Sequence, residues 1–345
     1  MKRTLWWVVL ALAALVINGC DEPNEPDLPR KAYHLDRVIG LEGLPEDVCA
    51  RGRWVAVANG TFGAAVFDVS DGAHPVRIFD YVASIYSQCT NVTLDTVHRY
   101  LAAWTDPSDV YNYQIFAFVP GDSQPHLRLD GLGTPMGGFT CRAVHSAAGD
   151  TMSFWFTDLS PTDWRMASIV RTRLSDTSAW EVMTSPCPEF RGPHGKPHGL
   201  DIRADGMLAL ANEDAGLVVY NTFTCHMSDT IDTPGIAYAC AWAGDYVVVA
   251  DEYRVTIVDA SNPDDITLAA SLDIAGASRL RKVAVDGRYA ALADEYDGIY
   301  VVDISNPHTP QYVQLLSLED PTGVAALNGR IYATDQSLGL VIYSR

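Results

Sequence analysis

Short apolar runs separated by polar turns fill the second half of the chain. Four such runs follow one another in the segments Lys282–Asp286, Arg288–Asp294, Ile299–Ile304 and Tyr312–Leu318. Asp286-Gly287 and Asp297-Gly298, which separate the first three, are pairs typical of tight hairpin turns. Pro307 ends the third run because proline cannot donate to a strand ladder. No run has the 3.6-residue period of a helix, so the pattern predicts four antiparallel strands.

The same unit recurs along the chain. An Ala followed by Asp or Asn, a short polar turn and an alternating apolar run recur in the segments Ala58–Ser70, Ala211–Phe223, Ala250–Ser261, Ala293–Ser305 and Thr334–Ser344. Asn212 and Asp294 are 82 residues apart, which corresponds to two periods of 41. Four strands in a period of about 40 residues are typical of one β-propeller blade.

The number of these units predicts how many blades the domain has. Seven begin near Asp47, Cys89, Cys141, Gly199, Ala239, Val283 and Val324. The second and third match weakly, so a ring of six blades with an expanded connection is the alternative. The last unit ends at Arg345 after three strands, and Tyr33–Gly43 precedes the first unit. We therefore predict an all-β fold, a β-propeller of four-stranded antiparallel blades closed by an N-terminal strand that completes the last blade.

The turn sequences resemble a known repeat. "TIVDASNP" and "YVVDISNPHTP" each follow "ADEY", and "FDVSDGAHP" from Phe67 is a looser copy. These segments are similar to LVIVD repeats, the β-propeller repeats of many exported bacterial proteins. The Trp-Asp ending of WD40 repeats and the double glycine of kelch repeats are absent from them. The resemblance implies a propeller outside the cytoplasm and implies little about activity.

The first 19 residues are typical of a signal peptide. Lys2 and Arg3 precede an unbroken apolar run from Leu5 to Ile17, which is too short to span a bilayer as a mature helix. The following Ile17-Asn18-Gly19-Cys20 resembles the lipobox of bacterial lipoproteins. That resemblance implies cleavage before Cys20 and lipid attachment to its sulfur. Ordinary secretion with an incidental thiol is the alternative.

We predict that residues 20–32 form a tether and that residues 33–345 form a single propeller domain. Pro23, Pro26 and Pro29 recur at every third position among acidic residues, a spacing that favours an extended chain. Together with a lipidated Cys20, this organisation predicts a protein anchored to the bacterial cell envelope, either periplasmic or on the outer surface.

The net charge of the mature chain excludes some classes of binding partner. Without Lys2 and Arg3, 22 basic residues face 43 acidic ones, for a net charge of −21. Such a chain does not bind nucleic acid through phosphates, and anionic lipid surfaces repel it. We therefore expect membrane attachment through the N-terminal lipid alone, and an unknown protein or small-molecule ligand as the partner.

Cysteine usage fits export. Of seven cysteines, six remain if Cys20 is lipidated, and an even number in an exported protein suggests disulfides. The absence of a C-x-x-C pair argues against thiol redox chemistry and zinc ribbons. Fifteen pairings are available to six cysteines. Cys187 and Cys225, in loop sequence flanking one repeat, are the candidate disulfide.

The propeller topology places several polar residues on one face. Turns between the second and third strands and connections between blades share that face, which carries Asn59, Glu213, Asp214, Asp251, Glu252, Asp294, Glu295 and Asp335. The connection "RGPHGKPHG" adds His194 and His198 near the channel mouth. His194, His198, Asp251 and Asp294 are the candidate ligands for a bound divalent cation. The alternative, which we favour for the aspartates, is that each repeated carboxylate caps its own turn.

Two functions follow from this reading. The first is a binding or scaffolding module that uses the acidic face. The second is a metal-dependent, lactonase-like hydrolase with its site at the channel mouth. No G-x-S-x-G or H-E-x-x-H motif supports the hydrolase, and the sequence nominates no catalytic residue and requires no cofactor. The binding module is therefore the preferred function.

Overall fold

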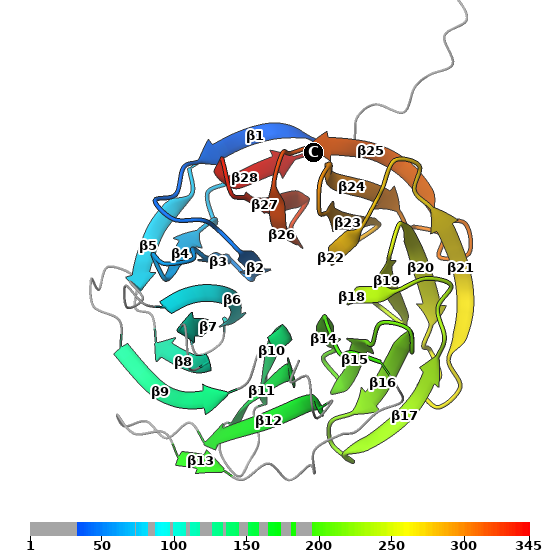
Figure 1. Ribbon diagram of the computed structural model, residues 1–345, viewed down its shortest axis with the longest axis horizontal. Helices are drawn as coiled ribbons and strands as arrows, with labels where there is room; N and C mark the ends of the chain where they lie inside the picture. The colour runs from blue at the N-terminus through cyan, green and yellow to red at the C-terminus, as the bar shows by residue number, and fades with distance from the viewer. Residues whose placement is uncertain are drawn as a thin grey trace, which may run out of the picture. The chain divides into compact units, whose positions relative to one another are not determined.

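The computed structural model describes the chain from Tyr33 to Arg345, where it forms one compact unit (Figure 1). Within it, the description leaves out residues 73, 82–86, 97–98, 108–110, 118–125, 134–135, 145–150, 159–164, 174–180 and 184–194. The described strands form seven four-stranded antiparallel sheets. Each sheet is one blade, and we number the blades along the chain from β2.

Every blade has an innermost, a second, a third and an outermost strand (Figure 1). The innermost strands are β2 (Asp47–Arg51), β6 (Ser87–Asp95), β10 (Met136–Val144), β14 (Leu200–Ile202), β18 (Ala237–Ala243), β22 (Leu280–Asp286) and β26 (Pro321–Leu327). The second strands are β3 (Trp54–Ala58), β7 (Tyr100–Pro107), β11 (Thr151–Asp158), β15 (Met207–Ala211), β19 (Tyr246–Asp251), β23 (Tyr289–Asp294) and β27 (Arg330–Asp335). The third strands are β4 (Ala64–Asp68), β8 (Tyr111–Ala117), β12 (Arg165–Arg173), β16 (Leu217–Asn221), β20 (Arg254–Asp259), β24 (Gly298–Asp303) and β28 (Gly339–Ser344). The outermost strands are β5 (Val76–Tyr81), β9 (His126–Gly133), β13 (Glu181–Met183), β17 (His226–Ile231), β21 (Thr267–Asp273), β25 (Gln311–Ser317) and β1 (His34–Ile39).

The innermost strands surround a central channel. Each contacts the innermost strand of the next blade, and β26 of the seventh blade contacts β2 of the first. The blades therefore form a closed ring of seven, as the repeat count predicted (Figure 1). The predicted starting points of all seven units lie in or next to these inner strands.

The N-terminal strand completes the last blade, which confirms the predicted closure. β1 pairs antiparallel with β28, from His34 opposite Ser344 to Ile39 opposite Leu340. Just before β1, the buried Tyr33 donates its backbone N–H to Oε1 of Gln314 at 2.9 Å. The amide nitrogen of Gln314 donates back to the Tyr33 carbonyl, also at 2.9 Å. The start of the domain is thus held by both the sixth and the seventh blade.

The core lies between blades, because successive side chains of a strand point to opposite faces of its sheet. In β4, Val66 packs in the cluster shared with the second blade, alongside Leu94. Its neighbour Phe67 packs in the cluster shared with the seventh blade, alongside Tyr332. Because both faces of such a strand are buried, its residues are apolar throughout, which explains the continuous apolar runs in the repeats.

The repeated Asp-x-Ser ending of the third strands is a turn cap. The carboxylates of Asp68, Asp259 and Asp303 accept the backbone N–H groups of Ser70, Ser261 and Ser305 at 2.9, 3.0 and 2.9 Å. Hydrogen bonds from the hydroxyl and backbone of Ser261 hold the pKa of Asp259 below its usual value. The LVIVD-like sequence therefore recurs because these three blades use the same cap.

The connections divide between two faces of the ring. We call the upper face the side that carries the turns between second and third strands and the connections between blades. Its described segments are 40–46, 59–63, 195–199, 212–216, 232–236, 252–253, 274–279, 295–297, 318–320 and 336–338. The opposite side, with the remaining turns, is the lower face. In the described part of the chain, no helix has the length and apolar character needed to cross a membrane.

Candidate functional site at the channel mouth

The repeated carboxylates of the upper face hold its turns together. Asp251 at the end of β19 is fully buried and accepts hydrogen bonds from the hydroxyls of Thr233 and Thr256, at 3.0 and 2.8 Å. It also accepts the backbone N–H of Gly235 at 3.1 Å. Burial raises the pKa of this carboxyl despite these bonds. Asp251 thus ties the connection into the fifth blade to the turn that follows β19.

Asp294 performs the same task in the sixth blade. Its carboxylate accepts the backbone N–H groups of Ser278, Arg279 and Tyr296 at 2.8, 2.7 and 3.0 Å. An unpaired buried amide is costly, so these bonds stabilise the turn and the connection together. The favoured structural interpretation of the repeated aspartates therefore describes what both side chains do in the fold.

Glycines let the connections between blades approach the turns closely. Three glycines each face a backbone oxygen of such a turn, in the pairs Gly43 with Asn59, Gly195 with Asn212, and Gly235 with Asp251. A Cβ atom added to any of these glycines would lie 2.2 to 2.9 Å from that oxygen. No side chain fits at such distances. Gly195 belongs to the "PHGKPHG" segment, so its sequence is set partly by this contact.

His198 lies at the channel mouth, as predicted, whereas His194 lies outside the described residues. Its Nε2 is 2.6 Å from Oε1 of Glu213, and its ring meets the Tyr238 ring edge-on at 5.6 Å between centroids. Burial lowers the pKa of His198, and the hydrogen bond and charge of Glu213 offset only part of that effect. An imidazole held by one carboxylate can donate or accept one proton at the mouth.

Basic and aromatic side chains continue this rim into the sixth blade. The Arg281 guanidinium lies 4.4 Å from the centroid of the Tyr238 ring and 3.3 Å from the Glu295 carboxylate. Arg279 contacts the same carboxylate at 2.9 Å. Burial alone would raise the pKa of Glu295, but hydrogen bonds and charge from both arginines hold it below its usual value. Glu295 therefore compensates one of the two positive charges.

A cavity of about 560 Å³ occupies the channel below this rim. Its ionisable lining comes from four blades and consists of Asp47, Cys49, Arg51, His198, Asp201, Tyr238, Cys240, Arg281 and Lys282. Nζ of Lys282 lies 3.1 Å from Oδ1 of Asp47, an ion pair between residues 235 positions apart. The volume is in the range of small-ligand sites, although the lining is more polar than that of most such sites.

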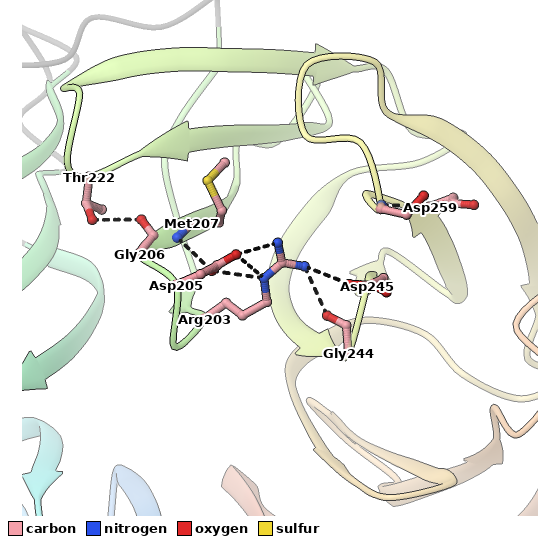
Figure 2. A network of polar contacts seen from close by, with 9 residues as sticks. Arg203, Asp205, Gly206, Met207, Thr222, Gly244, Asp245 and Asp259 are labelled. Carbon is pink, nitrogen blue, oxygen red and sulfur yellow. Dashed lines mark hydrogen bonds and ion pairs between the residues drawn. The ribbon is translucent and has the colours of Figure 1, made fainter.

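Toward the lower face, the channel ends in contacts between the fourth and fifth blades. The Asp201 carboxylate accepts the backbone N–H of Trp242 at 2.9 Å, and burial raises its pKa. The Arg203 guanidinium stacks on the Trp242 ring at 4.3 Å from the centroid. Figure 2 shows Arg203 also reaching the Gly244 carbonyl at 3.2 Å and the Asp245 carboxylate at 3.4 Å. At this end of the channel, Asp201 and Arg203 therefore join the fourth blade to the fifth.

The structure separates the residues nominated as cation ligands. Asp251 and Asp294 cap their own turns, and His198 contacts Glu213. Within the described residues, no group of three or more His, Cys, Asp or Glu side chains is placed to hold a metal ion. A cation ligated by His198 together with those aspartates stays a prediction without a geometry to support it.

Sequence reasoning did not identify Asp47, Asp201, Tyr238, Arg281 and Lys282 as channel residues. They face the channel from inner strands of four different blades. The only local signal is that polar residues interrupt the apolar pattern of these strands, as Arg281-Lys282 does in "LRKVAVD".

The cysteines fall into two groups. Cys49, Cys89 and Cys240 are free thiols, contrary to the expectation that an even number in an exported chain would pair. They lie on inner strands of three blades, where Cys89 and Cys240 are buried and Cys49 is half-buried. Burial raises the pKa of the Cys49 thiol. Cys225 is disulfide-bonded. Its predicted partner Cys187 lies outside the described residues, so that pairing stays a prediction.

Comparison with solved structures identifies the fold. The chain superimposes on the β-propeller domain of Cps50 (Swd1) from Myceliophteria thermophila with a TM-score of 0.65 and 12% identity, covering 91% of this chain and 99% of that one. The WD40 propeller of Doa1 gives a TM-score of 0.62 at 11% identity, with 91% and 97% covered. A chain of the Mitotic Checkpoint Complex gives 0.64 at 11% identity, with 95% and 96% covered. At these identities the likeness shows the fold alone.

Comparison of sequences identifies the repeat. No curated protein matches the chain. The LVIVD repeat model matches residues 234–274 and 279–314, which correspond to the fifth and sixth blades. The protein is therefore a seven-bladed β-propeller that carries LVIVD repeats in two adjacent blades.

Proposed function

We propose that this protein is an envelope-anchored binding or scaffolding module that engages a protein or small ligand through its upper face. The observation that carries the proposal is the channel mouth. There, the non-repeating side chains of His198, Tyr238 and Arg281 come together from three blades around a cavity of about 560 Å³. A residue that only maintains a blade would be expected to recur, as the turn-capping aspartates do in the fifth, sixth and seventh blades.

No observation favours the metal-dependent hydrolase over this module. The carboxylates nominated for it accept backbone amides, and removing them from those amides would expose buried donors. We therefore develop the binding module alone.

Crosslinking in the native bacterium tests the binding face. A photoreactive amino acid at Tyr296 samples the upper face of the sixth blade, where that side chain is 60% exposed. The same replacement at Tyr312, 50% exposed on β25 of the same blade, is the matched control. We expect a discrete higher-mass adduct from position 296 and none from position 312, detected on immunoblots. Equal labelling at both positions, or none at 296, would contradict the proposed face.

Lipidation at Cys20 has its own test. We expect the mature N-terminus to be Cys20 carrying acyl chains, seen by mass spectrometry of membrane-extracted protein. Cys20→Ser should move the protein from the membrane to the soluble fraction. An unmodified Cys20, or cleavage at another position, would remove the anchor from the proposal and leave the binding face untouched.

A further inference from the structure

Large apolar side chains are exposed in one repeated turn of the upper face. The turn between the second and third strands presents Phe62 in the first blade, Tyr253 in the fifth, Tyr296 in the sixth and Leu338 in the seventh. Leu44 joins them from the connection into the first blade and is 56% exposed. We call these five residues the apolar ring. The fourth blade has Asp214 and Ala215 in this turn, so the turn itself does not require a large apolar side chain.

The apolar ring distinguishes the upper face from the lower one. Among the described residues, the lower face exposes one large apolar side chain, Phe223. The other six lie on outermost strands around the rim of the ring and are Leu35, Val38, Val76, Met227, Leu268 and Tyr312. Exposed apolar groups gathered on one face of a domain are typical of an interaction surface.

The same face carries uncompensated negative charge. Glu42, Asp214, Asp232, Glu252 and Glu319 lie on its connections and turns, and none of them forms an ion pair with a described residue. At the channel mouth, Arg279 and Arg281 share Glu295, and Lys282 is paired with Asp47, so these three cations leave one positive charge against the five free carboxylates. On the lower face, Asp68 and Asp303 are paired with arginines, whereas Asp264 and Asp265 form no ion pair with a described residue.

The channel mouth adds to this negative field. Burial raises the pKa of Glu46, and the neighbouring carboxylates of Asp320 and Asp47 raise it further. Lys282 is the cation that opposes this effect, and it already contacts Asp47. Glu46 is thus influenced by two carboxylates and one ammonium group, and a further cation supplied by a partner would be favoured beside it.

We propose that the upper face docks a cationic, amphipathic polypeptide segment, whose apolar side chains contact the apolar ring and whose Lys or Arg side chains contact the surrounding carboxylates. The proposal rests on the binding function above and specifies its partner. Guanidinium and ammonium groups also stack on exposed tyrosines, as Arg254 of the protein itself does on Tyr253 at 4.7 Å. An anionic membrane surface would be repelled by the same carboxylates, so the occupant is a polypeptide.

Three fluorescein-labelled 14-residue peptides test the chemistry on the protein from Asp21 to Arg345. The first combines Lys and Leu, the second replaces every Leu by Ser, and the third replaces every Lys by Glu. We expect the Lys–Leu peptide to bind at least tenfold more tightly than the Lys–Ser peptide, and the Glu–Leu peptide not to bind, by fluorescence anisotropy. Raising the salt from 50 to 200 mM should weaken binding, because exposed charges are screened.

Variants locate the binding. Tyr253→Ala with Tyr296→Ala should weaken Lys–Leu binding about tenfold, whereas Tyr312→Ala on the rim should not change it. Glu252→Gln with Glu319→Gln should weaken it severalfold. Asp264→Asn with Asp265→Asn removes the same charge from exposed positions on the lower face and should have no effect. Unchanged melting temperatures would show that all four variants fold.

Two results would overturn the proposal. One is equal binding of the Lys–Leu and Lys–Ser peptides, and the other is equal loss in the upper-face and control variants. If none of the peptides binds while position 296 still forms its crosslink in the bacterium, the cationic partner is wrong and the binding face stands. If both fail, the proposed function fails with it.

Discussion

Deleting residues 33–43 is expected to abolish cooperative unfolding of the domain and to cause aggregation. The deletion removes β1, whose whole length pairs with β28. It leaves β28 as an unpaired edge with the apolar sequence Leu340–Tyr343, and an exposed apolar edge strand is a template for pairing between molecules. The ring would then lack the covering strand of its last blade.

The contacts of Tyr33 add to the loss. This side chain is 1% exposed, and its ring meets the Tyr289 ring edge-on at 5.7 Å. Burial of a large aromatic residue contributes about 3–5 kcal/mol, a large part of the stability of a typical domain. Without Tyr33, both polar groups of the 7% exposed Gln314 side chain also lose their partners.

Thermal unfolding followed by circular dichroism and size-exclusion chromatography measures the effect. A synthetic peptide of residues 33–43 added during refolding should restore the monomer and part of the transition, because the missing strand has a defined pairing register. A scrambled peptide of the same composition should restore nothing. A shortened chain that stays monomeric and melts at the temperature of the intact one would show that three strands suffice for the seventh blade.

Replacing Asp335 by alanine should destabilise the domain by about 3–5 kcal/mol. This fully buried carboxylate accepts the backbone N–H groups of Asp320, Ser337 and Leu338 at 3.0, 2.9 and 2.9 Å. It also accepts the Ser337 hydroxyl at 2.6 Å. Alanine would leave these donors without an acceptor in the blade that closes the ring.

The effect should depend on pH in a known direction. Burial alone would raise the pKa of Asp335, but the hydrogen bonds from Ser337, Asp320 and Leu338 hold it below its usual value. A lowered pKa in the folded state means that the carboxylate stabilises the fold fully above the unfolded pKa of about 3.9. That stabilisation is lost as the pH falls through the folded pKa, so Asp335→Asn should differ most from the native protein at neutral pH.

Urea unfolding at pH 7 and pH 3.5 measures both effects. Asp214→Ala is the control, because Asp214 is exposed in the corresponding turn of the fourth blade and should change stability by less than about 0.5 kcal/mol. Equal losses from the two alanine variants, or a difference between Asp335→Asn and the native protein that grows in acid, would contradict the role assigned to Asp335.

The ring could be predicted from sequence because its determinants are local. Hairpin pairs such as Asp286-Gly287 and the cap of Ser305 by Asp303 are encoded within a few residues, and they repeat. The closing strand followed from counting, since the last unit lacked one strand. Six blades stayed an alternative only because the second and third units match the repeat weakly.

The channel could not be predicted in the same way. The contact between Asp47 and Lys282 joins residues 235 positions apart, and nothing in either neighbourhood indicates the other. The apolar ring has a local signal, the large residue within the turns "ADEY" and "NGTF", but its exposure is visible only in the folded ring. The sequence indicates the position of a residue in its blade, and ring closure determines its neighbours from other blades.

The clamp on Tyr33 also has a mechanical consequence. If Cys20 is lipidated, any pull between the membrane and a bound partner reaches the domain at Tyr33, where Gln314 holds the backbone by two hydrogen bonds. The force then acts on the hydrogen bonds between β1 and β28. In the described ring, this is the only pair of neighbouring strands within a blade that are not consecutive in the chain. The force needed to detach β1 would therefore set the tension at which the anchored propeller opens.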